Sequence, residues 1–190
     1  MVWRLASRAR IVTISGMTRN VPDPTSTIGT LSHRGLIRIE GGDALRLLQG
    51  QLSNDVGALG VAQQQFTSLN SPKGRLLATG FLMRAAPEAY WFDLPRTLVE
   101  SVIKRLKMFV PRPGQHRRWV IWSPSAPRAH LDHDLTDAWR LADLQAGIAN
   151  LGPETQDRFI AQHAGVDRLN GLSFTKGCFT GQEVIARLHY

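Results

Sequence analysis

The sequence predicts an α+β protein, and three observations carry that prediction. Its 190 residues are 43% hydrophobic and 20% charged, which is ordinary for a globular chain with a buried core. Short runs of apolar and β-branched residues alternate with turns that contain glycine or proline. Other segments carry apolar residues at helical spacing. No internal repeat is visible, and no apolar run approaches the roughly 18–20 residues that span a bilayer.

The strand predictions rest on β-branched and apolar runs that end at turn residues. They cover residues 35–40, 65–69, 75–83 and 90–94, with a short fifth strand at 119–122. The second and third are joined by a tight turn at residues 70–74. There Pro72 fixes φ, and Gly74 can take a positive φ.

Four helices are predicted from apolar residues three and four positions apart. The first follows Asp43, a candidate N-cap, and places Leu45, Leu48 and Leu52 on one face. The other three cover residues 98–108, which are basic and amphipathic, residues 136–145, and residues 154–162, opened by Pro153 in the first turn.

Residues 1–30 form a separate lead-in, and residues 31–190 form the predicted domain, with a subdomain break near the proline-rich residues 111–135. Residues 1–16 carry three arginines and no acidic residue, and a second methionine follows at Met17. We expect that translation begins at Met17 and that the protein is located in the bacterial cytoplasm. The alternative is that residues 1–16, which resemble a mitochondrial presequence, direct the protein to the matrix.

Charge and cysteine content limit the classes of function. The formal net charge of +8 indicates an anionic partner, either nucleic acid or a polyanionic small molecule. The single cysteine excludes an internal disulfide, and one thiol holds neither a metal nor an iron–sulfur cluster without partners. A free thiol without a disulfide framework fits a reducing compartment.

That cysteine, Cys178, lies in the most informative stretch of the chain, residues 176–183 (KGCFTGQE). Thr180 and Glu183 have the spacing of a capping box, which predicts a helix with Thr180 as its N-cap. Cys178 would then lie two residues before the helix, where the helix dipole and Lys176 both favour the thiolate. The alternative is a buried cysteine in a glycine-containing turn.

Four segments in order now carry a resemblance to a known family. Residues 176–183 resemble the signature K-G-C-[FY]-x-G-Q-E of the YgfZ family, folate-binding proteins of the aminomethyltransferase (GcvT-like) superfamily. The other three resemble the family's N-terminal strand and "QGQLTND" element, its "P-x-G-R" hairpin and its "G-I-P…P-E-T" segment; they are residues 35–55, 68–75 and 147–156. The resemblance implies a folate-binding fold of mixed sheets with flanking helices. It also implies a role in iron–sulfur cluster assembly or repair, and the bacterial members are often labelled tRNA-modifying proteins.

The sequence also departs from the family pattern. It stops at Tyr190, whereas relatives continue into a C-terminal β-barrel domain, so a truncated member without that barrel is expected. Aminomethyltransferases carry an acidic pair in the strand after their Gly-Gly turn, but the matching residues 74–80 contain no acid. A non-transferase relative is therefore predicted.

The resemblance implies a set of site residues. Cys178 would be the reacting group, and Asp55 and Glu183 are the carboxylates that would accept hydrogen bonds from a pterin. Lys176, Gln182 and Arg187 complete the expected folate site. Asp55 has the alternative role of a residue in a helix C-terminal turn. Glu183 has two alternatives, the capping box and an ion pair with Arg187 four residues later.

The predicted function is that of a tetrahydrofolate-binding accessory protein in iron–sulfur cluster assembly or repair. Its expected partners are assembly or client proteins, with no membrane contact. The alternative is folate-dependent tRNA modification or RNA binding, because residues 104–122 interleave cations with aromatic residues. Those cations would otherwise be solvated, or would bind a folate polyglutamate tail.

A second group of polar side chains, within residues 130–137, has metal-capable types at close spacing. We expect instead a solvated turn whose acidic residues favour the N-terminus of the helix that follows.

Overall fold

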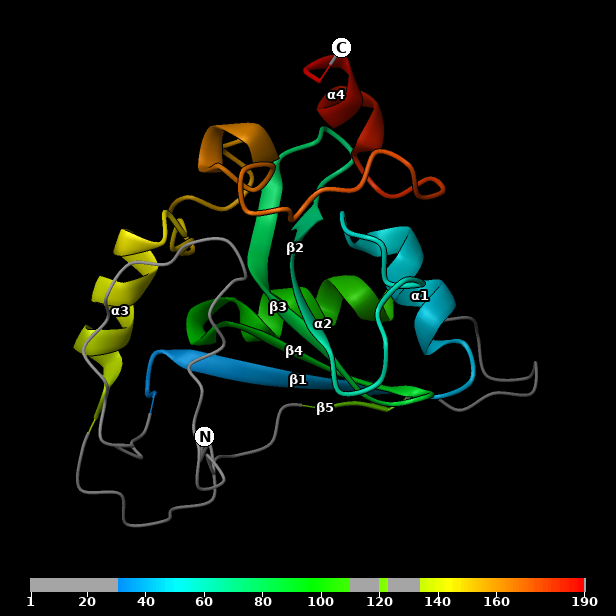
Figure 1. The fold of residues 1–190 in the computed structure, drawn as a ribbon, viewed down its shortest axis with the longest axis horizontal. Helices are drawn as coiled ribbons and strands as arrows, with labels where there is room; N and C mark the ends of the chain where they lie inside the picture. The colour runs from blue at the N-terminus through cyan, green and yellow to red at the C-terminus, as the bar shows by residue number, and fades with distance from the viewer. Residues whose placement is uncertain (1–30, 110–119, 123–133, 190) are drawn as a thin grey trace.

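The computed structural model describes residues 31–109, 120–122 and 134–189 (Figure 1). The expectations for residues 1–30, and most of those for 111–135, fall outside these ranges. The helices are α1 (Ala44–Gln51), α2 (Val99–Lys107), α3 (Thr136–Gln145) and α4 (Gln182–Arg187), with short 3₁₀ helices η1 (Arg96–Leu98) and η2 (Ala161–Ala164). In this part of the chain no helix has the length and apolar character needed to cross a membrane.

One antiparallel sheet organises the fold, in the strand order β2-β3-β4-β1-β5. Its strands are β1 (Arg34–Glu40), β2 (Gln64–Asn70), β3 (Leu76–Ala86), β4 (Ala89–Pro95) and β5 (Val120–Trp122). All five predicted strands are confirmed, as is the α+β class. The turn between β2 and β3 is also confirmed, since Gly74 has a φ of 71°.

One face of the sheet carries the hydrophobic core. Ile37 and Ile39 of β1 and Phe92 of β4 are fully buried on it. Helix α2, behind the sheet in Figure 1, adds three buried apolar side chains, Val99, Val102 and Leu106. The approach is close at Gly35, where a Cβ atom would lie 2.4 Å from Val99 Cγ2. Burying this amphipathic face supplies the main stabilisation of α2.

The opposite face carries a buried charged cluster. Leu36 of β1 and Phe81 of β3 both pair with Asp93 of β4, so their side chains share this face. Arg34 Nε and Nη2 donate to the two carboxylate oxygens of Asp93, both at 3.1 Å. Both side chains are at most 10% exposed. Removing one partner of such a buried ion pair leaves the other charge buried without compensation, which strongly lowers the stability of the fold.

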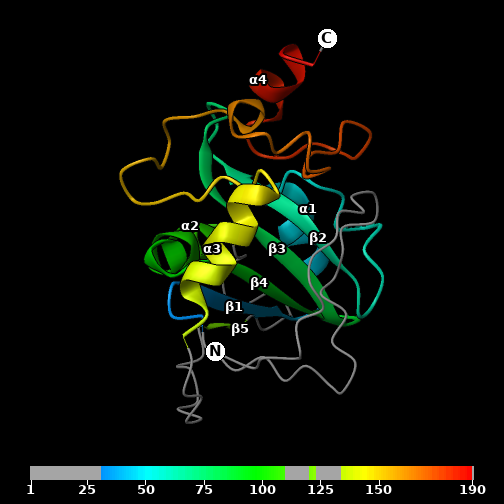
Figure 2. The ribbon, with the colours of Figure 1, turned by 60° about the vertical axis from the view of Figure 1, so that its left-hand side comes forward.

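Helix α3 stands beside the end of the sheet where β1 begins, near this pair (Figure 1 and Figure 2). Its one buried residue is Asp143, which interacts electrostatically with Arg34 and Asp93. Burial raises the pKa of the Asp143 carboxyl above its ordinary value, and Arg34 opposes the rise. No described residue bonds Asp143 Oδ2. The predicted helix at 136–145 is confirmed, and the one side chain that it buries is a carboxylate rather than an apolar group.

The predicted helix at residues 154–162 is wrong. The segment forms turns, followed by η2. Leu76 N donates to Phe159 O and Asp157 N donates to Leu76 O, both at 2.7 Å, so the segment is fastened to the start of β3. Asp157 has a φ of 58°, which a right-handed helix does not allow. Hydrogen bonding to the start of β3 therefore overrides the local helical pattern.

Candidate functional site

Cys178 is exposed at the tip of a short loop that is fixed on both sides. On one side, the buried Lys176 ammonium donates to three backbone carbonyls around the end of α1. On the other side, Thr180 N donates to Gly50 O of α1 at 3.1 Å. The Phe179 ring is buried and lies 5.2 Å from the Lys176 ammonium. The alternative that Cys178 is a buried cysteine is therefore wrong.

Lys176 was predicted to act on the Cys178 thiol, but its ammonium instead bonds to backbone carbonyls. Its Nζ lies 2.7 Å from Gln49 O, 2.7 Å from Leu52 O and 2.8 Å from Asn54 O. These carbonyls come from the C-terminal end of α1 and the residues after it, where a helix presents unpaired acceptors and the negative end of its dipole. Burial lowers the pKa of Lys176 to about 8, against the opposing attraction of Asp55.

The predicted capping box at Thr180 and Glu183 is wrong. Helix α4 begins at Gln182, and its N-cap is Gly181, whose φ of 83° lies in the left-handed region. Thr180 Oγ1 instead approaches Gly50 O and Gln51 Oε1, at 3.5 and 3.4 Å. Cys178 is therefore four residues before the first helical residue. Glu183 pairs with Arg187 on the outside of α4, both side chains 77% exposed, which confirms the alternative proposed for them.

The start of α4 packs directly on the turn between β2 and β3. A Cβ atom at Gly181 would lie 2.4 Å from Ser71 O, and one at Gly74 would lie 2.7 Å from Val184 Cβ. Both glycines have a positive φ, so conformation and close approach both require them. Two of the segments that carry the family resemblance, 68–75 and 176–183, thus meet here. A third meets them through the contacts of Lys176 and Thr180 with α1.

Two polar residues after α1 tie distant segments together, and sequence reasoning missed this role. Ser53 Oγ donates to Gly171 O at 2.6 Å and accepts from Ser68 N at 2.9 Å. Asn54 Nδ2 donates to Phe66 O and to Asn170 O, at 2.9 and 2.7 Å. The available signal was a run of short polar side chains directly after an apolar helix. Such side chains bond readily to nearby backbone groups.

Asp55 turns its carboxylate back toward α1. Oδ1 accepts from Gln49 Nε2 and Gly57 N, both at 3.0 Å, and from Ala58 N at 3.3 Å. The hydrogen bond from Gln49, aided by those from the backbone, lowers the pKa of Asp55 below its ordinary value. Oδ2 accepts no hydrogen bond from the part of the chain that the structure describes. Asp55 is thus the helix-terminal residue that we considered as an alternative, and it keeps one available oxygen.

Gln182 lies at the first position of α4. Its Oε1 accepts from Phe179 N at 3.3 Å. This bond connects residues 176–180, which we call the thiol loop, to the start of the helix. Its amide Nε2 has no bond to a described residue. Of the predicted site residues, Lys176, Cys178 and Gln182 therefore share one loop, and Asp55 adjoins the α1 end that Lys176 contacts. Glu183 and Arg187 point outward and bond to each other.

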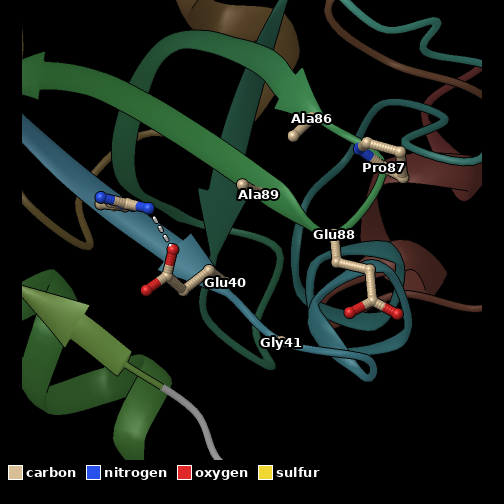
Figure 3. A pocket seen from close by; sticks show the side chains of 7 residues that line it. Glu40, Gly41, Ala86, Pro87, Glu88 and Ala89 are labelled. Carbon is tan, nitrogen blue, oxygen red and sulfur yellow. Dashed lines mark ion pairs between the residues drawn. The ribbon is translucent and has the colours of Figure 1, made fainter.

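A shallow hollow of about 730 Å³ lies at the turn between β3 and β4, between Glu40 on one side and Glu88 on the other (Figure 3). Its residues are Arg38, Glu40, Gly41, Ala86, Pro87, Glu88 and Ala89. None of them is a predicted site residue, and Glu40 is already paired with Arg38. The hollow is therefore not lined by Cys178 or by any other predicted site residue.

The described residues contain no group of three or more His, Cys, Asp or Glu side chains that could hold a metal ion. Three members of the polar group at residues 130–137, namely His130, Asp132 and His133, lie outside these residues. Asp134 behaves as expected, because its Oδ1 accepts from Thr136 N, at 2.9 Å, at the start of α3.

Comparisons with known proteins place the chain in a family, although no family model matches it. An uncharacterised protein of Haemophilus influenzae is 30% identical over 190 residues, which cover 85% of this chain and 68% of that protein. The tRNA-modifying protein YgfZ of Hamiltonella defensa is 26% identical, and that of Yersinia enterocolitica 22%, each match covering 86% of this chain. The chain belongs to the YgfZ/GcvT-like family. It spans about two thirds of the length of these relatives, at 66–68%.

Among solved structures, the glycine cleavage system aminomethyltransferase T of Bartonella henselae matches this family member with a TM-score of 0.43 and 21% sequence identity. The match covers 48% of this chain and 25% of that protein.

Proposed function

We propose that this protein is a tetrahydrofolate-binding accessory factor in the assembly or repair of iron–sulfur proteins, with Cys178 as its reacting group. The observation that carries the proposal is the presentation of the thiol, exposed on a loop whose two ends are bonded to α1. A thiolate is the form of cysteine that binds iron. A thiol held in one place can donate one ligand to a cluster in transit, while the client or assembly protein donates the others.

The cluster is the substrate in this scheme, so the chain needs no further metal ligand of its own. Lys176, Thr180 and Gln182 hold the loop, and Gly177 leaves open space beside Cys178, since a Cβ atom there would meet nothing within 4 Å. A free thiol of this kind suits a reducing compartment such as the cytoplasm of a bacterium.

Tetrahydrofolate requires an acceptor carboxylate for its pterin amino group and polar donors nearby. Asp55 fits the first requirement, because one oxygen is fixed by three donors and the other is available. Gln182 Nε2 fits the second, and Lys176 keeps positive charge next to Asp55. The Arg187 cation, now paired with Glu183, suits the glutamate tail. When bound, tetrahydrofolate supplies reduced pterin nitrogens that carry one-carbon units.

The chain is not proposed as an aminomethyltransferase. Strand β3 (Leu76–Ala86) contains no carboxylate where those enzymes carry their acidic pair. Without that group, the described residues offer no evident means of driving the transfer.

The thiol role is tested with Cys178→Ser in an assay that follows activation of a cluster-dependent client enzyme. We expect the variant to fold normally and to lose most of the activation. The matched control is Thr175→Ala, an exposed neighbour in the same segment, which should stay near wild type. Full activity of Cys178→Ser would refute the thiol role.

Folate binding is tested separately by titrating tetrahydrofolate and following quenching of tryptophan fluorescence. Saturable binding should weaken at least about tenfold in Asp55→Asn, which corresponds to about 1.4 kcal/mol. Glu183→Ala should not weaken binding, because it frees the Arg187 guanidinium for the glutamate tail. Glu88→Ala, in the hollow at the β3–β4 turn, is the control and should bind like wild type. Absence of saturable binding in the wild-type protein would refute the folate proposal.

A second candidate function is RNA binding, which is favoured by one surface feature and by the relatives that are named as tRNA-modifying proteins. The C-terminal end of α2 exposes Lys104, Lys107 and the Phe109 ring, and the Arg105 guanidinium lies 5.0 Å from that ring. Cations beside an exposed aromatic ring suit phosphate contact and base stacking. Affinity for tRNA should fall steeply with salt and drop in the double variant K104A/K107A, but not in the α1 control Arg46→Ala. Equal affinities would exclude this surface.

A further inference from the structure

The Lys176 side chain makes more hydrogen bonds to the end of α1 than any other side chain of residues 176–180. It is 7% exposed, and its ammonium has three donors. All three are matched, with carbonyl oxygens of Gln49, Leu52 and Asn54 at 2.7–2.8 Å. Bonds from a charged donor are stronger than those between neutral groups. The end of α1 is thus closed by a residue more than 120 positions later in the chain.

A second attachment of the loop to α1 lies four residues after Lys176. Thr180 N donates to Gly50 O, and the buried Phe179 ring packs beneath the same ammonium. Between the two attachments lie Gly177 and Cys178, both exposed. Two short spans of chain, each ending at a bonded residue, leave the thiol little freedom to move relative to α1.

We propose that Lys176 is a positioning residue for the thiol: its ammonium clamps residues 176–180 to the end of α1 and so fixes where Cys178 stands relative to that helix. The inference rests on the proposed thiol function and deepens it. The loop itself has no apolar side chain except Phe179 in the core, so apolar packing alone does not hold it. The ammonium, rather than the length of the side chain, is the part that matters.

Three substitutions separate charge from bulk. Lys176→Met keeps an unbranched side chain of similar length but removes every donor, whereas Lys176→Arg keeps the charge and the donors. Lys73→Met removes an exposed lysine of the turn between β2 and β3 and is the matched control. If Lys176→Met fails to fold, Lys176→Gln takes its place, since it is neutral and retains an amide donor.

The first measurement is amide hydrogen exchange on the full chain. In Lys176→Met we expect the Thr180 amide, bonded to Gly50 O, to exchange at least about tenfold faster than in wild type. The Phe92 amide in the central strand β4 should be unchanged, and Lys176→Arg should restore much of the protection of Thr180. Unchanged exchange at Thr180 in the neutral variant would overturn the proposal, because the clamp would then be dispensable.

The second measurement is activation of the client enzyme together with the alkylation rate of Cys178 by iodoacetamide. Lys176→Met should lower activation at least about tenfold while the small reagent still reaches the thiol within a few-fold of the wild-type rate. Lys176→Arg should recover part of the activation. If Cys178→Ser is inactive but Lys176→Met activates like wild type, the positioning role fails and the thiol function survives. If Cys178→Ser is fully active, the thiol function fails, and the positioning role fails with it.

Discussion

Helices α2 and α3 bury different kinds of side chain toward the same sheet. Helix α2 buries Val99, Val102 and Leu106, which is the ordinary arrangement of an amphipathic helix. Helix α3 buries only Asp143, while its apolar Trp139, Leu141 and Leu144 are 38%, 56% and 71% exposed. The comparison teaches that apolar spacing predicts where a helix is, but not which of its faces meets the sheet.

The difference has an electrostatic origin. The sheet face under α2 presents Ile37, Ile39 and Phe92, which apolar side chains cover with a gain in free energy. The sheet near α3 presents the buried pair of Arg34 and Asp93. A polar group is better placed beside such a pair than an apolar one, because it can bond or balance the buried charge.

The largest expected effect comes from breaking the pair near α3. Arg34→Met leaves the Asp93 carboxylate buried without its partner, so the free energy of unfolding should fall by about 3–5 kcal/mol. Urea-induced unfolding followed by circular dichroism measures it. The double variant R34M/D93L, which replaces both charges, should recover a large part of the loss. A loss below about 1 kcal/mol in Arg34→Met would mean that the pair is solvated and behaves as a surface pair.

Truncating the apolar contact of α2 is expected to have the next largest effect. Leu106 is fully buried, so Leu106→Ala removes apolar contact and leaves a cavity. The free energy of unfolding should fall by about 2–5 kcal/mol, measured in the same urea series. A much smaller loss would show that α2 relaxes into the space and packs more loosely than the structure indicates.

Asp143→Asn gives a smaller effect that depends on pH. Because burial raises the pKa of Asp143 in the folded protein, its contribution to stability is full below the pKa of the unfolded chain and is lost as pH rises through the folded pKa. At pH 7 the neutral variant should therefore be more stable by about 1 kcal/mol, the order of the cost of an unsatisfied buried polar atom.

That advantage should vanish as the pH approaches the ordinary range of a carboxyl group, because the wild-type Asp143 is then also neutral. Unfolding in urea at several pH values between 4 and 7 measures it. A variant that is less stable than wild type at pH 7 would show instead that the Asp143 charge stabilises α3, through Arg34.

The smallest effect is expected on the outer side of α3. Leu144 is 71% exposed, so Leu144→Ala should change the free energy of unfolding by less than about 0.5 kcal/mol. Set beside Leu106→Ala, this variant makes the same chemical change on the other helix. A loss above about 1 kcal/mol would show that Leu144 is covered in solution. The two helices would then differ less in how far their apolar side chains are buried.

The strands were the most predictable part of the fold. Each ends at a turn whose residues demand it, as Gly74 shows with its positive φ, so local chemistry is enough. Residues 154–162 were predicted wrongly because their bonds to Leu76 of β3 are long-range, and no local pattern reports them. Helix α3 was predicted correctly from apolar residues that prove to be exposed.

The arrangement of the candidate site could not be predicted from the sequence. The sequence singled out Cys178 and the glycines around it, and the thiol is exposed. It assigned Thr180 to a helix cap, whereas the structure uses Thr180 N to hold Gly50 O, because Gly181 adopts the left-handed conformation that starts α4. Lys176 was expected to act on the neighbouring thiol, but the nearest unsatisfied carbonyls belong to α1. Spacing along the chain carries no information on such partners.

The separation between Lys176 and Gln49, 127 residues, also has a kinetic consequence. A contact this distant in sequence cannot close until the intervening chain has been synthesised, and closing so long a loop costs more conformational entropy than closing a short one. The loop that carries the thiol can therefore be attached to the end of α1 only after residue 176 has been made.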